Sequence, residues 1–309
     1  MREPSYLSLY RSGELACRIE TAWAMLSHCE LCPRRCGVNR LDGERGTCGM
    51  GALPKVASWN LHPWEEPPIS GTRGSGTIFF SGCNGRCLFC QNYPLSHLGY
   101  GDVVAIERMS EMMLELQHKG AHNINFVTPT HFLPAILAAL PRAIEGGLDR
   151  PLVYNTSGYE RAEVLRLLEG IIDIWLPDSK YADDATAHRL SGFERYVEHN
   201  RAALSEIYRQ VGPELEVDEE GIAWRGMIIR HMVLPQGLAG SAGVLHWIAE
   251  HLSPEVHVSL MDQYFPAHRA LGDPLLGRKV TWQEYQAALE AFDAAGLACG
   301  WRQCTLEDE

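Results

Sequence analysis

The sequence predicts an α/β protein, a partial (β/α)6 barrel with a cysteine-rich, irregular N-terminal extension. Short, nearly continuous apolar runs alternate with amphipathic stretches over most of the chain. Apolar strands joined by helices are typical of a parallel sheet buried on both faces, with right-handed crossovers. A doubly wound open sheet is the alternative, which strand patterning does not separate from a partial barrel. Both place active-site groups at the carboxyl ends of the strands.

Six apolar runs are the expected strands, at residues 77–80, 123–128, 152–156, 171–176, 227–234 and 256–261. Helical spacing of apolar residues predicts helices at residues 14–27, 110–119, 133–145, 161–169, 241–251 and 282–295. Residues 33–76 are rich in Gly, Pro and Arg and show no sustained period, so we expect an irregular wrapping segment there.

Two regions follow from this pattern. Residues 1–75 form the helical and cysteine-rich extension with a four-cysteine metal site, and residues 76–309 form the barrel. An insertion around residues 182–226 carries a charged helix and the acidic run ELEVDEEG, which we expect to be a solvated hairpin or lid.

Composition excludes several classes of protein. The 309 residues carry a formal charge of −12, which argues against nucleic acid as a partner because phosphate binding needs clustered Lys and Arg. No apolar run approaches the roughly 20 residues that span a bilayer, and the N-terminus is charged where a secretory signal is apolar. We therefore expect a cytoplasmic protein without a membrane partner, in which ten cysteines indicate metal or redox chemistry.

The main motif comes directly after the first strand. The run SGCNGRCLFC holds Cys83, Cys87 and Cys90 in a C-x3-C-x2-C spacing. Iron–sulfur clusters commonly take four cysteines, so three thiolates leave one iron free for an exogenous ligand, as in catalytic metal sites. The alternative is a zinc site completed by His97 or by a cysteine from the first group.

The C-x3-C-x-aromatic-C run after the first strand resembles the signature of radical S-adenosylmethionine (SAM) enzymes, whose fold is a partial (β/α)6 barrel. The resemblance extends to GTIFFSGCNGRCLFCQNYPLSH, VYNTSGY, IDIWLPDSKY, IIRHMVLP and VHVSLMDQYFPAH. These segments are similar to the PflX-type branch, relatives of the pyruvate formate-lyase activating enzymes, over roughly residues 29–270.

The resemblance implies that Cys83, Cys87 and Cys90 hold a [4Fe–4S] cluster whose unique iron chelates SAM. One electron, from a reduced flavodoxin or ferredoxin-type donor, then cleaves SAM to methionine and a 5′-deoxyadenosyl radical. That radical abstracts hydrogen from a substrate, either a small molecule or a partner protein in which it installs a glycyl radical. The protein supplies positioning and electrostatics.

The resemblance also implies SAM-facing or substrate-facing residues. These are Asn155, Thr156 and Ser157 after the third strand, Asp178 and Lys180 in the PDSK turn, Arg230 on the fifth strand, and His268 after the sixth. For each of them singly, a structural ion pair or loop hydrogen bond is the alternative. The sequence departs from the activating enzymes at the second strand, where NFVTPTH replaces their Gly-Gly-Glu element, so we expect Thr128 and nearby backbone carbonyls to hold the SAM amino group.

A second cysteine group precedes the barrel. Cys29, Cys32, Cys36 and Cys48 follow C-x2-C-x3-C-x11-C, and four thiolates complete either a structural zinc site or a fully ligated auxiliary cluster. Zinc is the slightly favoured interpretation, because such sites staple irregular segments that lack a core. Four unmetallated thiols are the third interpretation.

Other functions fit the same motifs. One is a non-catalytic zinc-binding module, and another is an electron-transfer iron–sulfur protein that never binds SAM. The stretch HPWEEPP, residues 62–68, either meets the cluster or caps the barrel.

Overall fold

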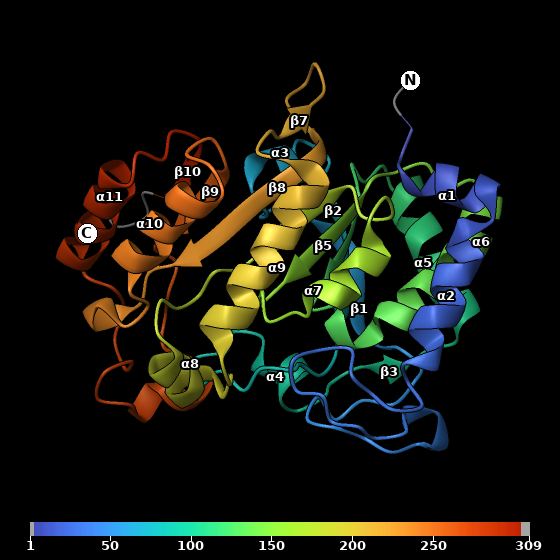
Figure 1. Cartoon of the computed structure of the whole chain (residues 1–309), viewed down its shortest axis with the longest axis horizontal. Coiled ribbons are helices and arrows are strands. Elements are labelled where there is room, and N and C mark those ends of the chain that lie inside the picture. The colour runs from blue at the N-terminus through green and yellow to red at the C-terminus, as the bar shows by residue number, and fades with distance from the viewer. Residues whose placement is uncertain (1–2, 304–309) are drawn as a thin grey trace.

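The computed structural model describes residues 3–303 and shows one large, open mixed sheet (Figure 1). Its strands run in the order β10-β9-β8-β6-β5-β4-β2-β1-β3, and β7 pairs with β8 off this path. Neighbours from β2 to β10 pair in parallel, whereas β1 and β3 add an antiparallel edge. The predicted α/β architecture is therefore confirmed, and the sheet does not close into a full barrel.

All six expected apolar runs overlap strands, and four further strands were not expected. Their bounds are β1 Lys55–His62, β2 Ser75–Phe80, β3 Asp102–Val103, β4 Ile124–Val127, β5 Leu152–Thr156, β6 Ile174–Pro177, β7 Glu216–Val217, β8 Ala223–Met232, β9 His257–Met261 and β10 Gly300–Arg302. Residues of β4, β5 and β6 are almost all buried, which explains why these strands read as continuous apolar runs.

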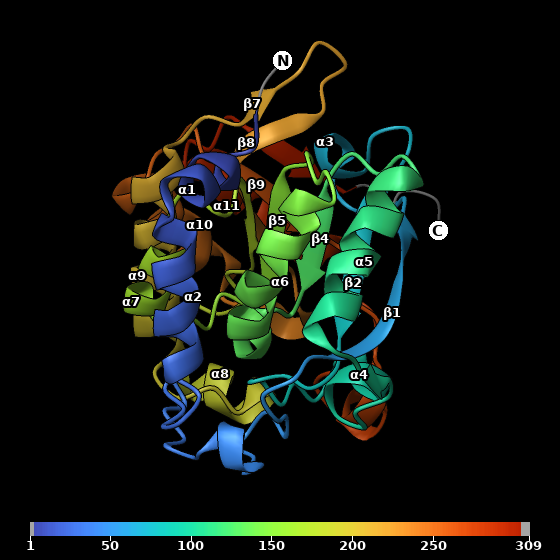
Figure 2. The same cartoon turned by 90° about the vertical axis from the view of Figure 1, so that its right-hand side faces the viewer.

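The bounds of the helices are α1 Tyr6–Ser12, α2 Glu14–Ala24, α3 Pro67–Ser70, α4 Tyr93–Ser96, α5 Ile106–His118, α6 Leu133–Glu145, α7 Ala162–Leu165, α8 Asp184–Ser191, α9 Tyr196–Val211, α10 Ser241–His251 and α11 Trp282–Ala294. In Figure 1, α5 and α6 lie on one flank of the molecule and α10 and α11 on the opposite flank, while α4 and α8 lie at its lower end and α3 at its upper end; Figure 2 gives the view from the side. Because the parallel strands follow one another in chain order, right-handed crossovers put their helices on the same face. A doubly wound sheet would reverse this order at a switch point, so that alternative is wrong.

Strand β1 was not expected, since residues 33–76 carry no strand signal. It pairs antiparallel with β2, with Val56 opposite Phe80 and His62 opposite Ser75. Only Val56 among its eight residues is buried, so β1 lacks the apolar pattern of the central strands. Its place in the sheet comes from backbone pairing, which composition does not reveal.

Residues 182–226 contain two helices and a hairpin. Helix α9 buries Tyr196, Leu204 and Ile207 and contacts β8, so it serves as the crossover helix between β6 and β8. The acidic run lies at the β7–β8 hairpin, where Glu216 and Val217 are exposed. The division of the chain at residue 75 stays a prediction. Of the described residues, no helix is long and apolar enough to cross a membrane.

Asp173 joins the N-terminal segment to the sheet. It lies just before β6, is 1% exposed, and accepts hydrogen bonds from the backbone N–H groups of Ser5 (3.0 Å) and Leu152 (3.1 Å). Since an unpaired buried N–H costs free energy, one carboxylate stabilises two segments that are distant in sequence.

Asp173→Ala should lower the free energy of unfolding by about 2–4 kcal/mol, because both buried donors lose their acceptor. Urea unfolding at fixed pH and equal iron content measures this change. Asp149→Ala is the matched control, because that side chain is 59% exposed, and it should stay within about 0.5 kcal/mol of the parent. An equally small effect of Asp173→Ala would contradict the anchoring role.

The same residue predicts a pH dependence. Burial raises the pKa of Asp173 from 3.8 to about 6. Between these values the native protein keeps a proton that the unfolded chain has released, so this residue's contribution to the free energy of unfolding falls as pH rises. Stability curves measured from pH 4 to pH 7 should show this fall in the parent and lack it in Asp173→Ala.

Candidate functional site

A cavity of about 380 Å³ opens at the carboxyl ends of the parallel strands. It brings together most of the predicted site residues, namely Cys83, Cys87, Cys90, Thr128, Asn155, Thr156, Ser157, Asp178, Lys180 and Arg230. The apolar part of the cavity wall includes Phe79, Phe89 and Phe193. Residues from separate strands therefore face one space, as the predicted topology requires.

The three-cysteine loop is fixed by backbone hydrogen bonds on both sides. The N–H groups of Arg86 and Leu88 donate to the carbonyls of Ser191 (2.8 Å) and Leu190 (2.8 Å) at the end of α8. Gly82 donates to Leu95 in α4 (3.0 Å). These contacts set the directions of the three cysteine side chains before any cofactor binds.

The thiols themselves lie in a low-polarity environment. Burial, together with the nearby Cys87 side chain, raises the pKa of Cys83 to about 12. The N–H of Gly85 donates to the Cys83 sulfur (3.2 Å), and this hydrogen bond lowers the pKa in part. Burial also raises the pKa of Cys87, and the ammonium of Lys180 opposes it. Metal binding would release these protons, since the thiolate is the ligand.

A network of charges lines the same cavity, close to Cys87. Lys180 contacts Asp178 (Nζ to Oδ2, 2.6 Å), and Arg230 contacts the same carboxylate (Nε to Oδ1, 3.3 Å). Burial alone would raise the pKa of Asp178, but the two cations reverse this and hold its pKa below the ordinary value. Asp178 is therefore ionised, and its neighbours can reach polar groups of a ligand.

Glu65 is a cavity residue from the stretch for which the sequence left open a contact with the cluster or a capping role. It is 7% exposed in its side chain, lines the cavity, and pairs with Arg230 (Oε2 to Nη1, 3.1 Å). It also accepts from the side-chain amides of Asn125 (3.1 Å) and Asn155 (3.4 Å). The residue lies in the HPWEEPP stretch, but no spacing in that stretch indicates which strands it meets.

The strand ends contribute polar groups with unusual backbone geometry. Thr128 follows β4 with φ of 59°, a conformation that is an outlier for a β-branched residue, and its N–H donates to the Asn155 carbonyl (2.9 Å). Such strain is found at ligand sites. The Thr156 hydroxyl instead donates to Glu160, a buried carboxyl whose pKa burial raises to about 7.

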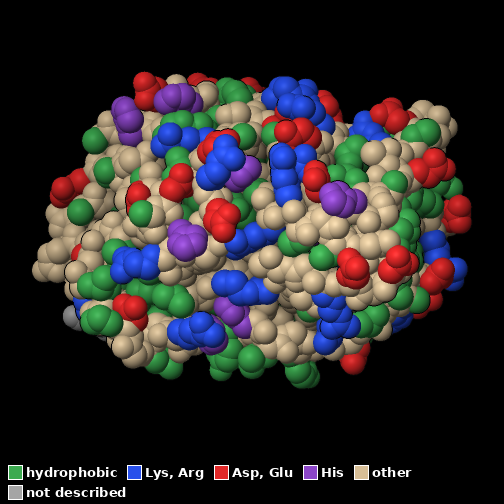
Figure 3. All heavy atoms as spheres, turned by 60° about the horizontal axis from the view of Figure 1, so that its bottom comes forward, with side chains coloured by type: hydrophobic (Ala, Val, Ile, Leu, Met, Phe, Trp, Pro, Cys, Tyr) green, Lys and Arg blue, Asp and Glu red, His purple; other side chains and the backbone are tan. Residues whose placement is uncertain are grey.

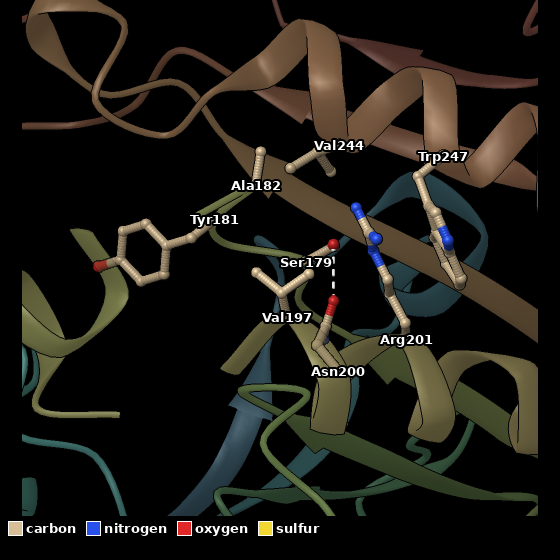
Figure 4. A pocket seen from close by; sticks show the side chains of 8 residues that line it. All are labelled: Ser179, Tyr181, Ala182, Val197, Asn200, Arg201, Val244 and Trp247. Atoms are coloured by element: carbon tan, nitrogen blue, oxygen red, sulfur yellow. Dashed lines mark hydrogen bonds between the residues drawn. The ribbon is translucent and has the colours of Figure 1, made fainter. Parts of the chain in front are cut away.

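Hydrogen bonds with Asn200 in α9 hold the turn that carries Asp178 and Lys180 (Figure 4). Ser179 and Asn200 share a hydrogen bond (Oγ to Oδ1, 2.8 Å) in a small cavity between α9 and α10. Asn200 also donates to the carbonyls of Asp178 (2.9 Å) and Gly158 (3.1 Å). Gly158 has φ of 69°, and a Cβ there would lie 2.1 Å from the Asp178 carbonyl oxygen, so only glycine fits.

His268 is not among the residues that line the cavity. Its ring stacks on Tyr93 (centroids 5.0 Å apart) and lies 4.6 Å from that of His97, on the α4 side of the cysteine loop. Its proposed contact with SAM stays a prediction.

The other four cysteines also converge in space. Cys29, Cys32, Cys36 and Cys48 line one small, mostly apolar cavity of about 20 Å³, although they span 20 residues of irregular chain. In residues 3–303, no three His, Cys, Asp or Glu side chains stand in a geometry that would hold a single metal ion. Cys17 is exposed and lies apart, while Cys304 lies outside the described residues.

Comparison with known proteins places this site in a family. A sequence model of the radical SAM superfamily matches residues 77–209, which include the three-cysteine loop and the Asp178–Lys180 turn. The uncharacterized protein MJ0674 of Methanocaldococcus jannaschii is 31% identical over 305 residues, or 94% of this chain and 82% of its own length.

Two solved structures are similar in part. A radical SAM methyltransferase from Sphaerobacter thermophilus matches with a TM-score of 0.49 and 15% identity, over 74% of this chain and 66% of its own. HydG, a maturase of the [FeFe]-hydrogenase, gives 0.49 and 11% identity, and this chain spans about half (54%) of its length. Residues 77–209 of this chain, which include the three-cysteine loop, therefore match the radical SAM superfamily.

Proposed function

We propose that this protein reductively cleaves SAM at a [4Fe–4S] cluster held by Cys83, Cys87 and Cys90, and that the resulting radical abstracts hydrogen from a substrate. One observation carries this proposal: the three cysteines line the same cavity as Asp178, Lys180 and Arg230. When bound and reduced, the cluster supplies the electron that breaks the S–C5′ bond of SAM.

The residues present fit such a cluster. The Gly85 N–H already donates to the Cys83 sulfur, as expected for a thiolate ligand, and a Cβ on Gly85 would lie 2.7 Å from the ring of Phe193. Phe89 is 4% exposed and packs on Tyr264, so it limits access of water to the loop. Exclusion of water from the cysteine sulfurs is one way in which a protein sets the reduction potential of an iron–sulfur cluster.

We infer roles for the chain's own side chains toward SAM. Lys180 and Arg230 neutralise its carboxylate, while the ionised Asp178 accepts from ammonium or ribose donors. Thr128, Asn155, Thr156 and Ser157 offer hydrogen-bonding groups along the same rim. Glu65 acts as a positioning residue, because its carboxylate orients both Arg230 and Asn155.

The substrate class follows from resemblance alone. Similarity to the PflX-type activating enzymes supports either a protein partner that receives a glycyl radical or a small-molecule substrate. We propose a cytoplasmic location and a reduced flavodoxin or ferredoxin-type donor. On the face that is brought forward in Figure 3, Lys and Arg side chains are interspersed with Asp, Glu and His side chains.

Cys83→Ala, Cys87→Ala or Cys90→Ala should each abolish 5′-deoxyadenosine formation, since three thiolates are the minimum that holds the cluster. Anaerobic assays with dithionite and SAM, followed by chromatography of the nucleoside products, measure this loss. Cys17→Ala, at an exposed position outside the site, should retain the parent rate. A colourless zinc protein that makes no 5′-deoxyadenosine after reconstitution would refute the proposal.

Thr128→Ala should weaken SAM binding by about two- to tenfold, the usual worth of one hydrogen bond. Equilibrium dialysis with the reconstituted protein measures the dissociation constant. Thr128→Ser is the matched variant, because it keeps the hydroxyl at the same backbone position, and it should bind as the parent does. Unchanged affinity in Thr128→Ala would remove this residue from the SAM site.

A further inference from the structure

A buried carboxyl joins the ends of two neighbouring strands. Glu160 is 1% exposed, and the hydroxyls of Thr130 (2.5 Å) and Thr156 both donate to its Oε1. Thr156 is the last residue of β5, while Thr130 follows β4 in the segment that also holds Thr128. Glu160 therefore holds in place the two strand ends that carry Thr128 and Thr156.

No cation of the protein accompanies this carboxyl. Among the described residues, no Lys, Arg or His forms an ion pair with Glu160, and its Oε2 makes no hydrogen bond. Burial raises the pKa of Glu160 to about 7, and the two hydroxyls act against that rise because they stabilise the ionised form. Once ionised, Glu160 is a buried negative charge that a cation bound nearby would stabilise.

Ionised Glu160 fixes the direction in which Thr156 can bond to a ligand. A threonine hydroxyl has one O–H donor and two acceptor lone pairs. The Thr156 proton is directed to Glu160, and the N–H of Gly158 (3.3 Å) occupies one lone pair. One lone pair remains, on a side chain that lines the SAM cavity. The ligand group at Thr156 is therefore a hydrogen-bond donor, which excludes the carboxylate of SAM.

The charges of the cavity indicate which donor binds there. The charged residues that line it are Glu65, Asp178, Lys180 and Arg230. Their formal charges cancel, and Glu160 adds one negative charge behind them. SAM has a carboxylate, an ammonium and a sulfonium, so its net charge is positive. An ammonium at Thr156 would lie near the uncompensated Glu160, whereas two cations already contact Asp178.

We propose that Thr156 accepts a hydrogen bond from the ammonium of SAM, and that Glu160 is the positioning residue that makes this hydroxyl an acceptor and supplies the counter-charge. This inference rests on the proposed function and deepens it, because it assigns a contact to the SAM amino group at a second strand end besides that of Thr128. Thr130 is not among the residues that line the cavity, so its bond to Glu160 only holds the carboxyl in place.

The test compares SAM with an analogue in which hydrogen replaces the amino group. Equilibrium dialysis of the anaerobically reconstituted protein, at about pH 8 where Glu160 is mostly ionised, gives both dissociation constants. Thr156→Val should weaken SAM binding roughly tenfold or more, the worth of a charge-assisted hydrogen bond, and should change the affinity for the analogue by less than about twofold. Equal weakening for both ligands, or no weakening for either, would overturn the proposal.

Further variants separate the role of Glu160 from folding. Glu160→Gln keeps the shape of the side chain and removes its charge, so the preference for SAM over the analogue should fall by roughly three- to tenfold. Thr156→Ser keeps the hydroxyl and should restore the preference. Thr130→Val is the matched control, because it loses a bond to the same oxygen away from the cavity, and it should keep the parent preference. A parent-like preference in Glu160→Gln would contradict the positioning role.

The parent protein separates this inference from the proposed function. A reconstituted parent that binds no SAM would refute the proposed function, and the assignment of Thr156 would fall with it. A parent that binds and cleaves SAM, together with a Thr156→Val variant that treats both ligands alike, would overturn the assignment alone.

Discussion

Parallel pairing in unbroken chain order is the constraint on which the site depends. Strands β2, β4, β5, β6, β8 and β9 lie side by side in that order, so their carboxyl ends meet along one edge. Every loop after a strand therefore opens on the same side. This is why Cys83, Thr128, Asn155 and Arg230, which are separated by up to 147 positions in the numbering, share one cavity.

Charge inside that cavity is balanced mostly within the protein. Arg230 lies between Asp178 and Glu65, and Lys180 lies on Asp178. Buried ions are tolerated when they are paired and hydrogen-bonded, and this network meets that condition through Asn155 as well. Such an arrangement can accept a zwitterionic ligand without large rearrangement, because each ionic group of the ligand finds a partner already oriented.

The N-terminal extension is physically part of the site. Its cysteine loop contacts the three-cysteine loop through Arg34, whose Nε donates to the Asn84 carbonyl (3.0 Å), and Arg86 donates in return to the Thr47 carbonyl. Its β1 strand pairs with β2, and its Glu65 enters the cavity. A structural change in the extension would therefore reach the three-cysteine loop through direct contacts.

The sequence by itself determined the alternation of strands and helices, because buried parallel strands must be apolar throughout, and it identified Cys83, Cys87 and Cys90 by spacing. It also located the turn with Asp178 and Lys180 by resemblance. Tertiary structure alone decided that β1 joins the sheet, that Glu65 reaches Arg230, and that the ring of His268 stacks on that of Tyr93. Those outcomes depend on contacts between segments that are distant in sequence, and local periodicity does not predict such contacts.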